Sequence, residues 1–252
     1  MSKSTPAKAI VITGASTGIG QACALHLDKL GFRVFAGVRN ETDASSLEQD
    51  SSDRLTPVYI DITKPDSILK ASKIMEAELK TVGLHGLVNN AGIVIAGPLE
   101  FVPIDALRSQ LEINVIGQVA VTQALLPLLR RCRGRIINMS SVSGRVATPF
   151  LGPYAASKFA LEALSDSMRL ELMPWGINVS VIQPGPISTP IWNKSMEVTK
   201  LMIDKLPSKA KVLYGPAFEA ILQWEHDIKQ SMSDPKVVVR AVEHALMASK
   251  PR

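Results

Sequence analysis

Short apolar runs rich in β-branched residues alternate along the chain with longer stretches of helical periodicity. The apolar runs cover 9–13, 33–38, 55–60, 86–88, 135–139 and 178–183. Runs that are apolar throughout, and do not alternate with polar residues, are typical of strands buried on both faces of a parallel sheet. The sequence therefore predicts six such strands.

Helical periodicity separates these strands, at 19–30, 65–82, 104–131 and 153–173. Strands that alternate with helices predict an α/β fold with a doubly wound, Rossmann-like parallel sheet that is covered by helices on both faces. No internal repeat or low-complexity linker divides the chain, so residues 1–252 are predicted to form a single Rossmann-like domain.

One segment, about 190–235, interrupts this rhythm. It is helical in pattern and rich in Met, Trp and Leu, with Trp192, Leu206 and Leu213 among its apolar residues. It follows the sixth strand and so begins at the carboxyl edge of the sheet, where ligands bind in doubly wound folds. We expect a helical substrate lid. A large apolar lid favours a lipophilic substrate, although the same residues could simply pack against the body or a partner subunit.

Composition and charge exclude several other classes of protein. The net charge is +5, but the arginine cluster at 130–135 adjoins a predicted strand and is interpreted as a solvated helix end, so no nucleic-acid partner is expected. Cys23 and Cys132 have no Cys or His at metal-ligand spacing, so neither a disulfide framework nor a metal site is expected. We see no signal peptide and no apolar run near the roughly 20 residues that span a bilayer. The expected location is the cytoplasm, without a membrane span.

A glycine-rich loop, TGASTGIG at 13–20, follows the first predicted strand. Glycines let the backbone turn tightly and approach a pyrophosphate, and the helix that follows directs its N–H groups and positive dipole end at that charge. An ordinary glycine turn is the alternative, but its place at the first strand–helix junction favours phosphate binding. The predicted cofactor contacts in this loop are Gly14, Ser16, Thr17, Gly18, Ile19 and Gly20.

The end of the second predicted strand favours NADP(H) over NAD(H). An acidic residue at this position would accept hydrogen bonds from the ribose hydroxyls and repel a 2′-phosphate. The chain instead has Val38 followed by Arg39, whose guanidinium can hold a phosphate through two donors. We therefore predict that Arg39 binds the 2′-phosphate; a surface arginine at a strand end is the alternative.

Tyr154 and Lys158 open the helix predicted at 153–173. Residues four apart lie on one helical face, so the phenol and the ammonium should be neighbours. A nearby positive charge stabilises the phenolate and should lower the pKa of Tyr154, which suits proton exchange near neutral pH. Alone, this spacing is a weak motif that occurs by chance in many helices.

Taken together, the motifs resemble those of the short-chain dehydrogenase/reductase family, in its Tyr-x-x-x-Lys branch. They occur in the family's order between residues 13 and 189. The matching residues are TGASTGIG at 13–20, Asp61, NNAG at 89–92, Asn114, Ser141, YAASK at 154–158 and PGPIST at 184–189. The stretch 154–185 looks like the hydroxysteroid and retinol dehydrogenase side of the family.

The resemblance implies a catalytic role for four residues. Tyr154 would be the general acid in reduction and the general base in oxidation, and Ser141 would donate a hydrogen bond to the reacting oxygen. Lys158 would hold the nicotinamide ribose and lower the pKa of the tyrosine. Asn114 would hold a water that relays protons between Lys158 and solvent.

The resemblance also implies further NADP(H) contacts. Asp61 would meet the adenine, residues 90–92 would line the adenosine ribose, and Ile187 and Thr189 would lie at the carboxamide. Asn89 is interpreted as a structural clamp within the sheet, and Ser140 should point away from the site. The implied cofactor contacts beyond the glycine loop are Arg39, Asp61, Ile62, Asn90, Ala91, Gly92, Tyr154, Lys158, Pro184, Gly185, Ile187 and Thr189.

The function expected from these features is an NADP(H)-dependent oxidoreductase that acts on a lipophilic ketone, aldehyde or alcohol. Two alternatives stay open: a reductase of 3-ketoacyl thioesters, and a protein that senses NADP(H) without turnover. A homodimer or homotetramer is also expected. The resemblance implies that the helices at 104–131 and 153–173 pair across a two-fold axis, and Ala155, Phe159, Ala163 and Met168 offer small and apolar side chains for this contact. Packing of these residues against the subunit's own sheet is the alternative.

Replacing Arg39 with alanine should weaken NADPH binding selectively, by on the order of 1.5–3 kcal/mol, because a charge-assisted phosphate contact is lost. Titration of the wild type and R39A with NADPH and with NADH measures the difference. Equal losses for the two cofactors would show that Arg39 does not bind the 2′-phosphate.

Overall fold

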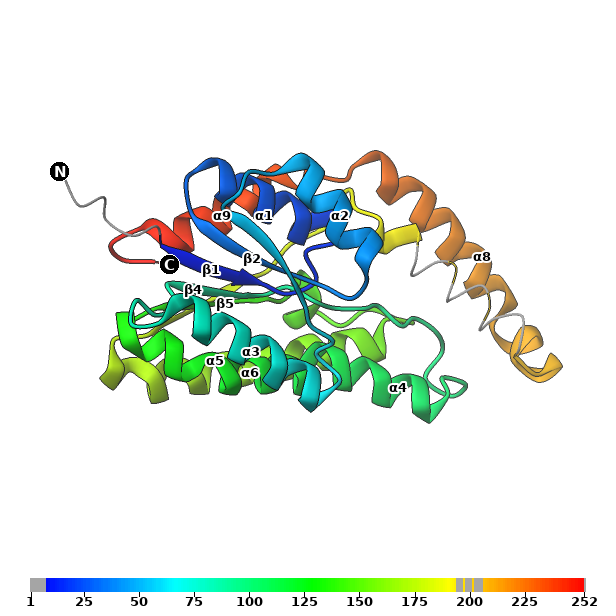
Figure 1. The fold of residues 1–252 in the computed structure, drawn as a ribbon. Coiled ribbons are helices and arrows are strands. Elements are labelled where there is room, and N and C mark those ends of the chain that lie inside the picture. The colour runs from blue at the N-terminus through cyan, green and yellow to red at the C-terminus, as the bar shows by residue number, and fades with distance from the viewer. Residues whose placement is uncertain (1–7, 194–196, 198–200, 202–205, 252) are drawn as a thin grey trace.

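A six-stranded parallel sheet forms the centre of the molecule (Figure 1). The computed structural model describes residues 8–193, 197, 201 and 206–251. The strands lie in the order β3-β2-β1-β4-β5-β6, so the order reverses at β1 and β4. Their bounds are β1 Ala9–Ile12, β2 Arg33–Val38, β3 Leu55–Tyr59, β4 Gly86–Asn89, β5 Arg135–Met139 and β6 Asn178–Ile182.

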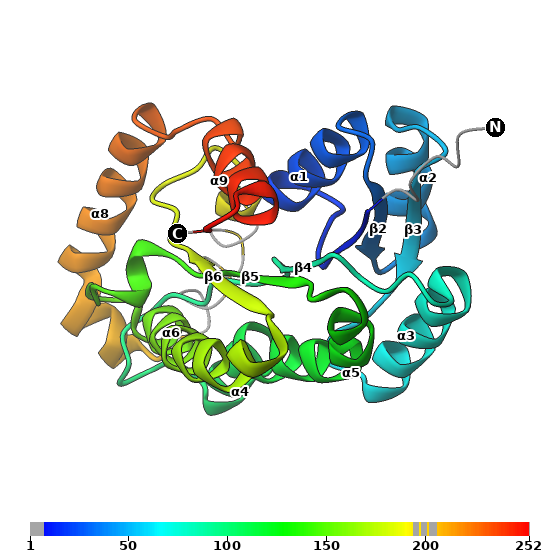
Figure 2. The same ribbon diagram turned by 90° about the vertical axis from the view of Figure 1, so that its left-hand side faces the viewer.

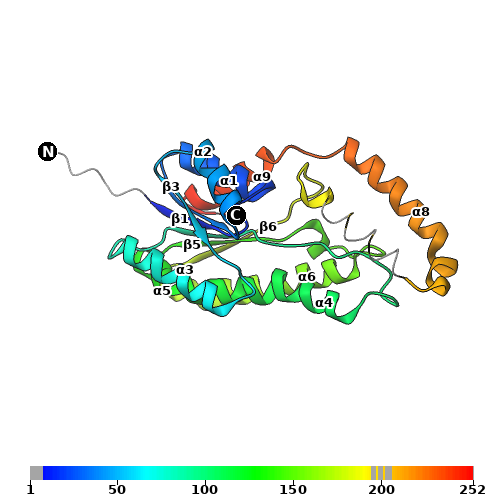
Figure 3. The ribbon, with the colours of Figure 1, turned by 45° about the vertical axis from the view of Figure 1, so that its right-hand side comes forward.

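Helices cover both faces of the sheet (Figures 1 and 2). On one face lie α1 (Gly18–Lys29), α2 (Glu41–Asp50) and α9 (Lys236–Met247); on the other lie α3 (Pro65–Leu79), α4 (Ile104–Leu111), α5 (Gly117–Cys132) and α6 (Gly152–Leu172). Helix α8 (Ser208–Gln230) extends at the side of the body remote from the N-terminus (Figure 3). The doubly wound α/β fold predicted from the sequence is therefore confirmed.

Each face of the sheet has its own hydrophobic core. In one core, Ile10 and Ile12 of β1 pack with Leu27 of α1 and with Val242 and Leu246 of α9. The other core combines apolar residues of the opposite strand faces with those of α3 and α5, among them Val11, Phe35, Met75, Leu125 and Leu129. Burial of each such side chain stabilises the fold by roughly 1.5–3 kcal/mol. The sheet is consequently a rigid base for the loops at its edge.

The predicted strands agree with the observed strands to within one residue, but two helices were missed. Helix α2 is polar and buries only Ala44 and Leu47, so it has little apolar periodicity. Its start is set by Asn40, whose side chain accepts a hydrogen bond from the Asp43 N–H at 2.9 Å. Helix α9 contains three consecutive valines, a pattern that favours a strand, yet it packs Val238, Val239 and Val242 into the core.

The helix predicted at 104–131 is not continuous. A π-helical turn, η1 (Glu112–Ile116), lies between α4 and α5 and contains the buried Asn114. Such turns are rare and are frequent at functional sites. The prediction of one regular helix was therefore wrong at the position of a candidate catalytic residue, because hydrophobic periodicity is almost unchanged by a single π-turn.

The expectation that no apolar run is long enough to span a membrane was wrong by length and composition. Within the described residues, the helical stretch Ile104–Cys132, which comprises α4, η1 and α5, meets both criteria. Val121, Leu125 and Leu129 pack in the core, and Gln118 and Thr122 are buried beside them, but 39% of the most apolar stretch is buried in total. Its apolar composition therefore comes from both sides of the helix, including Ile116, which is exposed.

The oligomer face expected on α6 is only partly exposed. Ala155 is buried within the subunit, and Met168 packs against the core shared with α5. The expectation was thus wrong for Ala155, because consecutive turns of α6 contact both the sheet and η1. Phe159 and Ala163 are exposed, as an intersubunit contact requires.

A buried chain of polar side chains connects β4 and β5 with the helices beneath them. The Asn89 Nδ2 atom donates to Thr122 Oγ1 and to Asn138 Oδ1, both at 2.9 Å. Asn138 Nδ2 in turn donates to Ser165 Oγ of α6 at 2.8 Å. The expected structural role of Asn89 is thus seen in its contacts, and the chain extends it to α5 and α6.

Replacing Asn138 with alanine should lower the free energy of unfolding by about 2 kcal/mol or more, because the buried amide of Asn89 loses one of its two acceptors and the buried hydroxyl of Ser165 loses its donor. The urea unfolding midpoint measures this. Asn178→Ala, at an exposed position on the neighbouring strand β6, is the control and should change the free energy by less than about 0.5 kcal/mol. Equal midpoints for both variants would contradict the structural role.

Candidate active site

The candidate site lies where the chain leaves the carboxyl ends of β1, β4, β5 and β6. The strand order reverses between β1 and β4, which is the topological switch point at which doubly wound sheets bind ligands. The loops after these strands carry the glycine motif, NNAG, Ser141 and PGPIST. The parallel sheet therefore brings four motifs that are far apart in the sequence to one edge.

The glycine loop packs closely against its own backbone and against the loop after β4. Gly14 and Gly18 have φ angles of +63° and +62°, a region that favours glycine. A Cβ atom on Gly20 would lie 2.3 Å from the Gly14 carbonyl oxygen and 2.5 Å from Asn90 Nδ2. The glycines therefore let the loop pack against itself and Asn90, and α1 begins at Gly18 without a side chain there, which suits a pyrophosphate site.

Asn90 and Thr13 hold this loop against the loop after β4. Asn90 Nδ2 donates to the carbonyl oxygens of Thr13 and Gly14, both at 3.0 Å. The Thr13 hydroxyl accepts from the N–H groups of Asn90 and Ala91 at 3.0 and 3.1 Å. Asn90, expected at the cofactor, therefore also supports the loop. Thr13 was not singled out from the sequence, although its place as the first residue of the glycine motif was a signal.

Arg39 and Asp61 lie at the ends of β2 and β3, on the side of the glycine loop. Arg39 is exposed and forms no ion pair with a described residue. The Asp61 side chain forms a local turn with the residues that follow it: its Oδ1 atom accepts from Thr63 N at 3.0 Å and from Thr63 Oγ1 at 2.7 Å. The hydrogen bond from the Thr63 side chain is the main reason that the pKa of Asp61 is lowered. Ile62, the next residue, is buried.

Ser141 and Tyr154 approach each other from β5 and α6. Ser141 is the second residue after β5, and its hydroxyl accepts from Ser143 N at 3.1 Å in the turn that begins there. Burial raises the pKa of Tyr154, and a hydrogen bond with Ser141 lowers it in part. The direction is opposite to that expected from the proximity of Lys158, because the phenol is largely removed from water.

Lys158 is buried one helical turn beyond Tyr154. Its Nζ atom donates to the Met139 carbonyl oxygen at 2.7 Å and lies 5.7 Å from the centroid of the Tyr154 ring. Burial lowers the pKa of Lys158 to about 8, and the negative charge of Glu162 opposes this. Tyr154 and Lys158 are therefore brought together as their spacing predicts, with the ammonium also fastened to the end of β5.

The Asn114 side chain is fully engaged with protein atoms. Its Oδ1 atom accepts from Ile93 N at 2.9 Å, and its Nδ2 atom donates to the Ile93 carbonyl at 3.0 Å and to Ser157 Oγ at 3.1 Å. Ser157 also donates to the Tyr154 carbonyl at 2.7 Å. Asn114 thus positions the start of α6 and the loop after β4. A water at this residue would have to be held by its backbone.

Ser140 lies beside Ser141 in sequence, but it does not share the contact with Tyr154. It is buried, and its hydroxyl is near Gly144, where an added Cβ would be 2.7 Å away. This places it beneath the turn that follows Ser141. The expectation that Ser140 points away from the reacting groups agrees with this placement.

The segment after β6 returns to the glycine loop. A Cβ on Gly18 would lie 3.2 Å from Thr189 Cβ, so the expected cofactor residue Thr189 is adjacent to the phosphate loop. Ile187 is buried, forms an isolated bridge with Ser233 and accepts from Trp192 Nε1 at 2.9 Å. Pro184 and Gly185 precede it at the same edge. The described parts of the expected lid are residues 190–193, 197, 201 and 206–235.

An aromatic cluster joins α8 to the loops around the site. Phe101 and Phe150 pack against Tyr214, with ring centroids 5.8 and 6.1 Å apart. Phe218 completes the cluster, and the Tyr214 hydroxyl donates to Glu100 Oε2 at 2.9 Å. The sequence analysis missed Phe101 and Phe150, which stand in loops without periodicity. They place the start of α8 close to the chain that leads into Tyr154.

Replacing Gly20 with alanine should weaken dinucleotide binding at least about tenfold, because the new methyl group forces the glycine loop away from Asn90 and shifts its backbone N–H groups. Titration of cofactor fluorescence measures the affinity. Gly215→Ala in α8 is the matched control, since nothing lies within 4 Å of its added Cβ. Undiminished affinity in G20A would contradict the assignment of the loop.

Comparison with known proteins was made once this geometry was established. The family model described as short chain dehydrogenase matches residues 8–200. Mouse "Retinol dehydrogenase 5" is 41% identical over 96% of this chain and 78% of its own length. Rat "D-beta-hydroxybutyrate dehydrogenase, mitochondrial" is 38% identical over 97% of this chain and 75% of its own.

A solved structure gives the same family. It is a short chain dehydrogenase from Burkholderia cenocepacia in complex with NADP, 32% identical, with a TM-score of 0.67 over 75% of this chain and 76% of its own. The family model covers most of the chain, and it includes every candidate catalytic residue and the glycine loop. On this evidence, the protein is a member of the short-chain dehydrogenase family.

Proposed function

We propose that the protein is an NADP(H)-dependent oxidoreductase that interconverts a carbonyl and an alcohol group on a lipophilic substrate. Membership of the family supports an oxidoreductase with a nicotinamide cofactor. The observation that carries the proposal is the placement of Ser141, Tyr154 and Lys158 together at the carboxyl edge of the sheet. The loop at residues 14–20 fits a dinucleotide, because its glycines place no side chain at the N-terminus of α1, which begins at Gly18.

The bound nicotinamide would supply or accept the hydride. In reduction, the Tyr154 phenol donates a proton to the carbonyl oxygen; in oxidation, its phenolate accepts one. Burial raises the pKa of Tyr154, so the phenol stays protonated at neutral pH and is suited to act as the acid in reduction. Ser141 donates a hydrogen bond to the same oxygen and thereby stabilises the charge that develops on it.

Lys158 supplies the positive charge of the site. With a pKa of about 8 its ammonium is predominantly charged at neutral pH. The bond to the Met139 carbonyl restrains it near Tyr154. The charge favours the phenolate that forms as the proton leaves, while the side chain remains available to hydrogen-bond a ribose. Both roles follow from one position on α6.

Preference for NADP(H) is supported by Arg39 at the end of β2. The side chain is exposed and forms no ion pair with a described residue, so its charge is available to a 2′-phosphate. The Burkholderia cenocepacia protein with which this chain shares 32% identity was crystallised with NADP. These two observations favour the phosphorylated cofactor.

A lipophilic substrate is supported by apolar residues near the carboxyl edge. The aromatic cluster of Phe101, Phe150, Tyr214 and Phe218 stands beside the chain leading to Tyr154. Leu99 and Val146, in the same loops, are exposed. The retinol dehydrogenase relative is named for a lipophilic alcohol, whereas the hydroxybutyrate dehydrogenase is named for a small acid. A substrate panel should therefore contain both kinds.

The direct test is a spectrophotometric assay of NADPH and NADH oxidation with a panel of retinal, ketosteroids, acetoacetate and a 3-ketoacyl thioester. We expect turnover with NADPH and with the lipophilic carbonyls. Turnover of the thioester alone would favour the ketoacyl reductase, and binding of NADPH without any turnover would favour a sensor. Preference for acetoacetate would contradict the lipophilic assignment.

Tyr154→Phe should reduce turnover by roughly 10²–10⁴-fold while cofactor affinity is almost unchanged, because only the proton-transferring hydroxyl is removed. Tyr59→Phe is the control: its hydroxyl donates to Glu41 on the surface, at the opposite end of the strand order from β6. Should Y154F keep more than about a tenth of wild-type turnover, another group must be the acid.

A further inference from the structure

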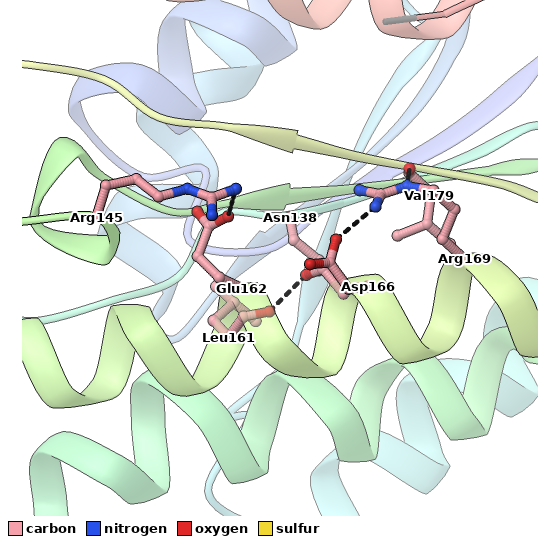
Figure 4. Close-up of polar contacts among 8 residues, drawn as sticks. Asn138, Arg145, Leu161, Glu162, Asp166, Arg169 and Val179 are labelled. Carbon is pink, nitrogen blue, oxygen red and sulfur yellow. Dashed lines mark hydrogen bonds and ion pairs between the residues drawn. The ribbon is translucent and has the colours of Figure 1, made fainter.

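A charged pair joins α6, one turn beyond Lys158, to the turn after Ser141. Glu162 is 5% exposed, and its Oε2 atom lies 3.1 Å from Nη2 of Arg145, which follows the turn after Ser141. Figure 4 shows the two side chains directed toward each other between α6 and the end of β5. Neither residue belongs to the motifs discussed above, and the mechanism proposed above does not use them.

The Glu162 carboxylate is incompletely paired. Its Oε1 atom is buried and has no hydrogen-bond partner among the described residues. Arg145 is 62% exposed, so water screens its charge more than that of the buried carboxylate. A buried carboxylate with a single partner is unfavourable unless another positive charge is near. Lys158, four residues earlier on the same helical face and also buried, can supply this charge at longer range, because its ammonium is bonded to the Met139 carbonyl and forms no direct ion pair with Glu162.

Glu162 is also packed against the turn that carries Ser141. A Cβ atom on Gly144 would lie 3.2 Å from Glu162 Oε1 and 2.7 Å from Ser140 Oγ. Because Gly144 has no side chain, the turn packs directly against the Glu162 carboxylate. This contact, together with Arg145, fixes Glu162 between the Ser141 turn and α6.

We propose that Glu162, held by Arg145, is a positioning residue for the reaction: its buried negative charge, four residues along α6, keeps the Lys158 ammonium charged beside Tyr154. This inference rests on the proposed function, since it assigns Glu162 a role through Lys158. Glu162 itself need not touch substrate or cofactor.

Other charged groups around Lys158 are less well placed to do this. Within α6, Asp166 and Arg169 lie beyond Glu162 and pair with each other at 2.5 Å on the surface (Figure 4). From α4, Asp105 and Arg108 form an exposed pair. Turn η1 contributes Glu112, and β5 contributes only the uncharged Met139 carbonyl. Burial lowers the pKa of Lys158 and Glu162 raises it; Glu162 is the one charge identified as acting on this pKa.

The signs of the expected effects follow from Coulomb's law. Removing a negative charge makes proton loss easier, so Glu162→Gln should lower the apparent pKa of the coupled Tyr154–Lys158 pair. Removing a positive charge does the opposite, so Arg145→Gln should raise it. A purely structural contact would weaken the site in both variants without moving the pKa in opposite directions.

The experiment is the pH profile of kcat/KM for carbonyl reduction in the wild type, E162Q, R145Q and D166N. Reduction needs the protonated pair, so activity falls as pH rises through the apparent pKa. We expect this alkaline limb to move down by about one pH unit in E162Q and upward in R145Q, and to stay in place in D166N. D166N is the matched control, because it neutralises the next acidic residue on the same helix.

A second measurement does not depend on activity. In protein labelled with ¹³C at the lysine side chains and free of cofactor, the Lys158 resonance, assigned by its loss in Lys158→Met, should titrate at lower pH in E162Q than in the wild type. An unshifted titration in folded E162Q, or shifts of the same sign in E162Q and R145Q, would overturn the proposal. If the wild type has no reductase activity, the proposed function fails, while the titration still decides the role of Glu162.

Discussion

The site depends on the hydrogen bonds that hold the loops after β1 and β4 together. Thr13 and Asn90 exchange four hydrogen bonds across this junction, two of them reaching Gly14 and Ala91. The strand order reverses there, so the loops diverge to opposite faces of the sheet and no ladder can join them. Side chains do so instead. They add to the backbone bonds from Thr13 N to the Val88 carbonyl and from Ala15 N to the Gly37 carbonyl, and together these bonds fix the glycine loop relative to the loop after β4.

Helix α6 carries Tyr154 and Lys158 and is attached to the sheet by side-chain hydrogen bonds. Lys158 is bonded to the end of β5, Ser165 to Asn138 within β5, and Arg169 to the Val179 carbonyl of β6 at 3.0 Å. These attachments recur at roughly helical spacing along one face, so the helix is fixed against rotation as well as translation. These bonds therefore also fix the orientation of Tyr154 at the start of the helix.

The sequence was sufficient for the strands and for the motif residues, but not for what supports them. Buried parallel strands have unambiguous apolar runs, and Tyr154 and Lys158 share a helical face because of spacing alone. Helix α2 has too few apolar residues to be recognised, and the π-turn at Asn114 scarcely alters hydrophobic periodicity. The raised pKa of Tyr154 and the pairing of Arg145 with Glu162 depend on burial and on tertiary contact. Local sequence patterns indicate neither the burial of Tyr154 nor the contact between Arg145 and Glu162.

The bridge between Ile187 and Ser233 has a consequence for how such a protein can change. Backbone bonds from Ser188 to Ser233 and from Ser233 to Pro186 close the chain between them into a loop whose two ends meet beside the cofactor edge. The entropy of closing a loop grows only slowly with its length. Residues within it can therefore be replaced, inserted or deleted with little disturbance of the sheet or of α6. Substrate choice can drift during evolution while the proton-transfer chemistry is inherited intact.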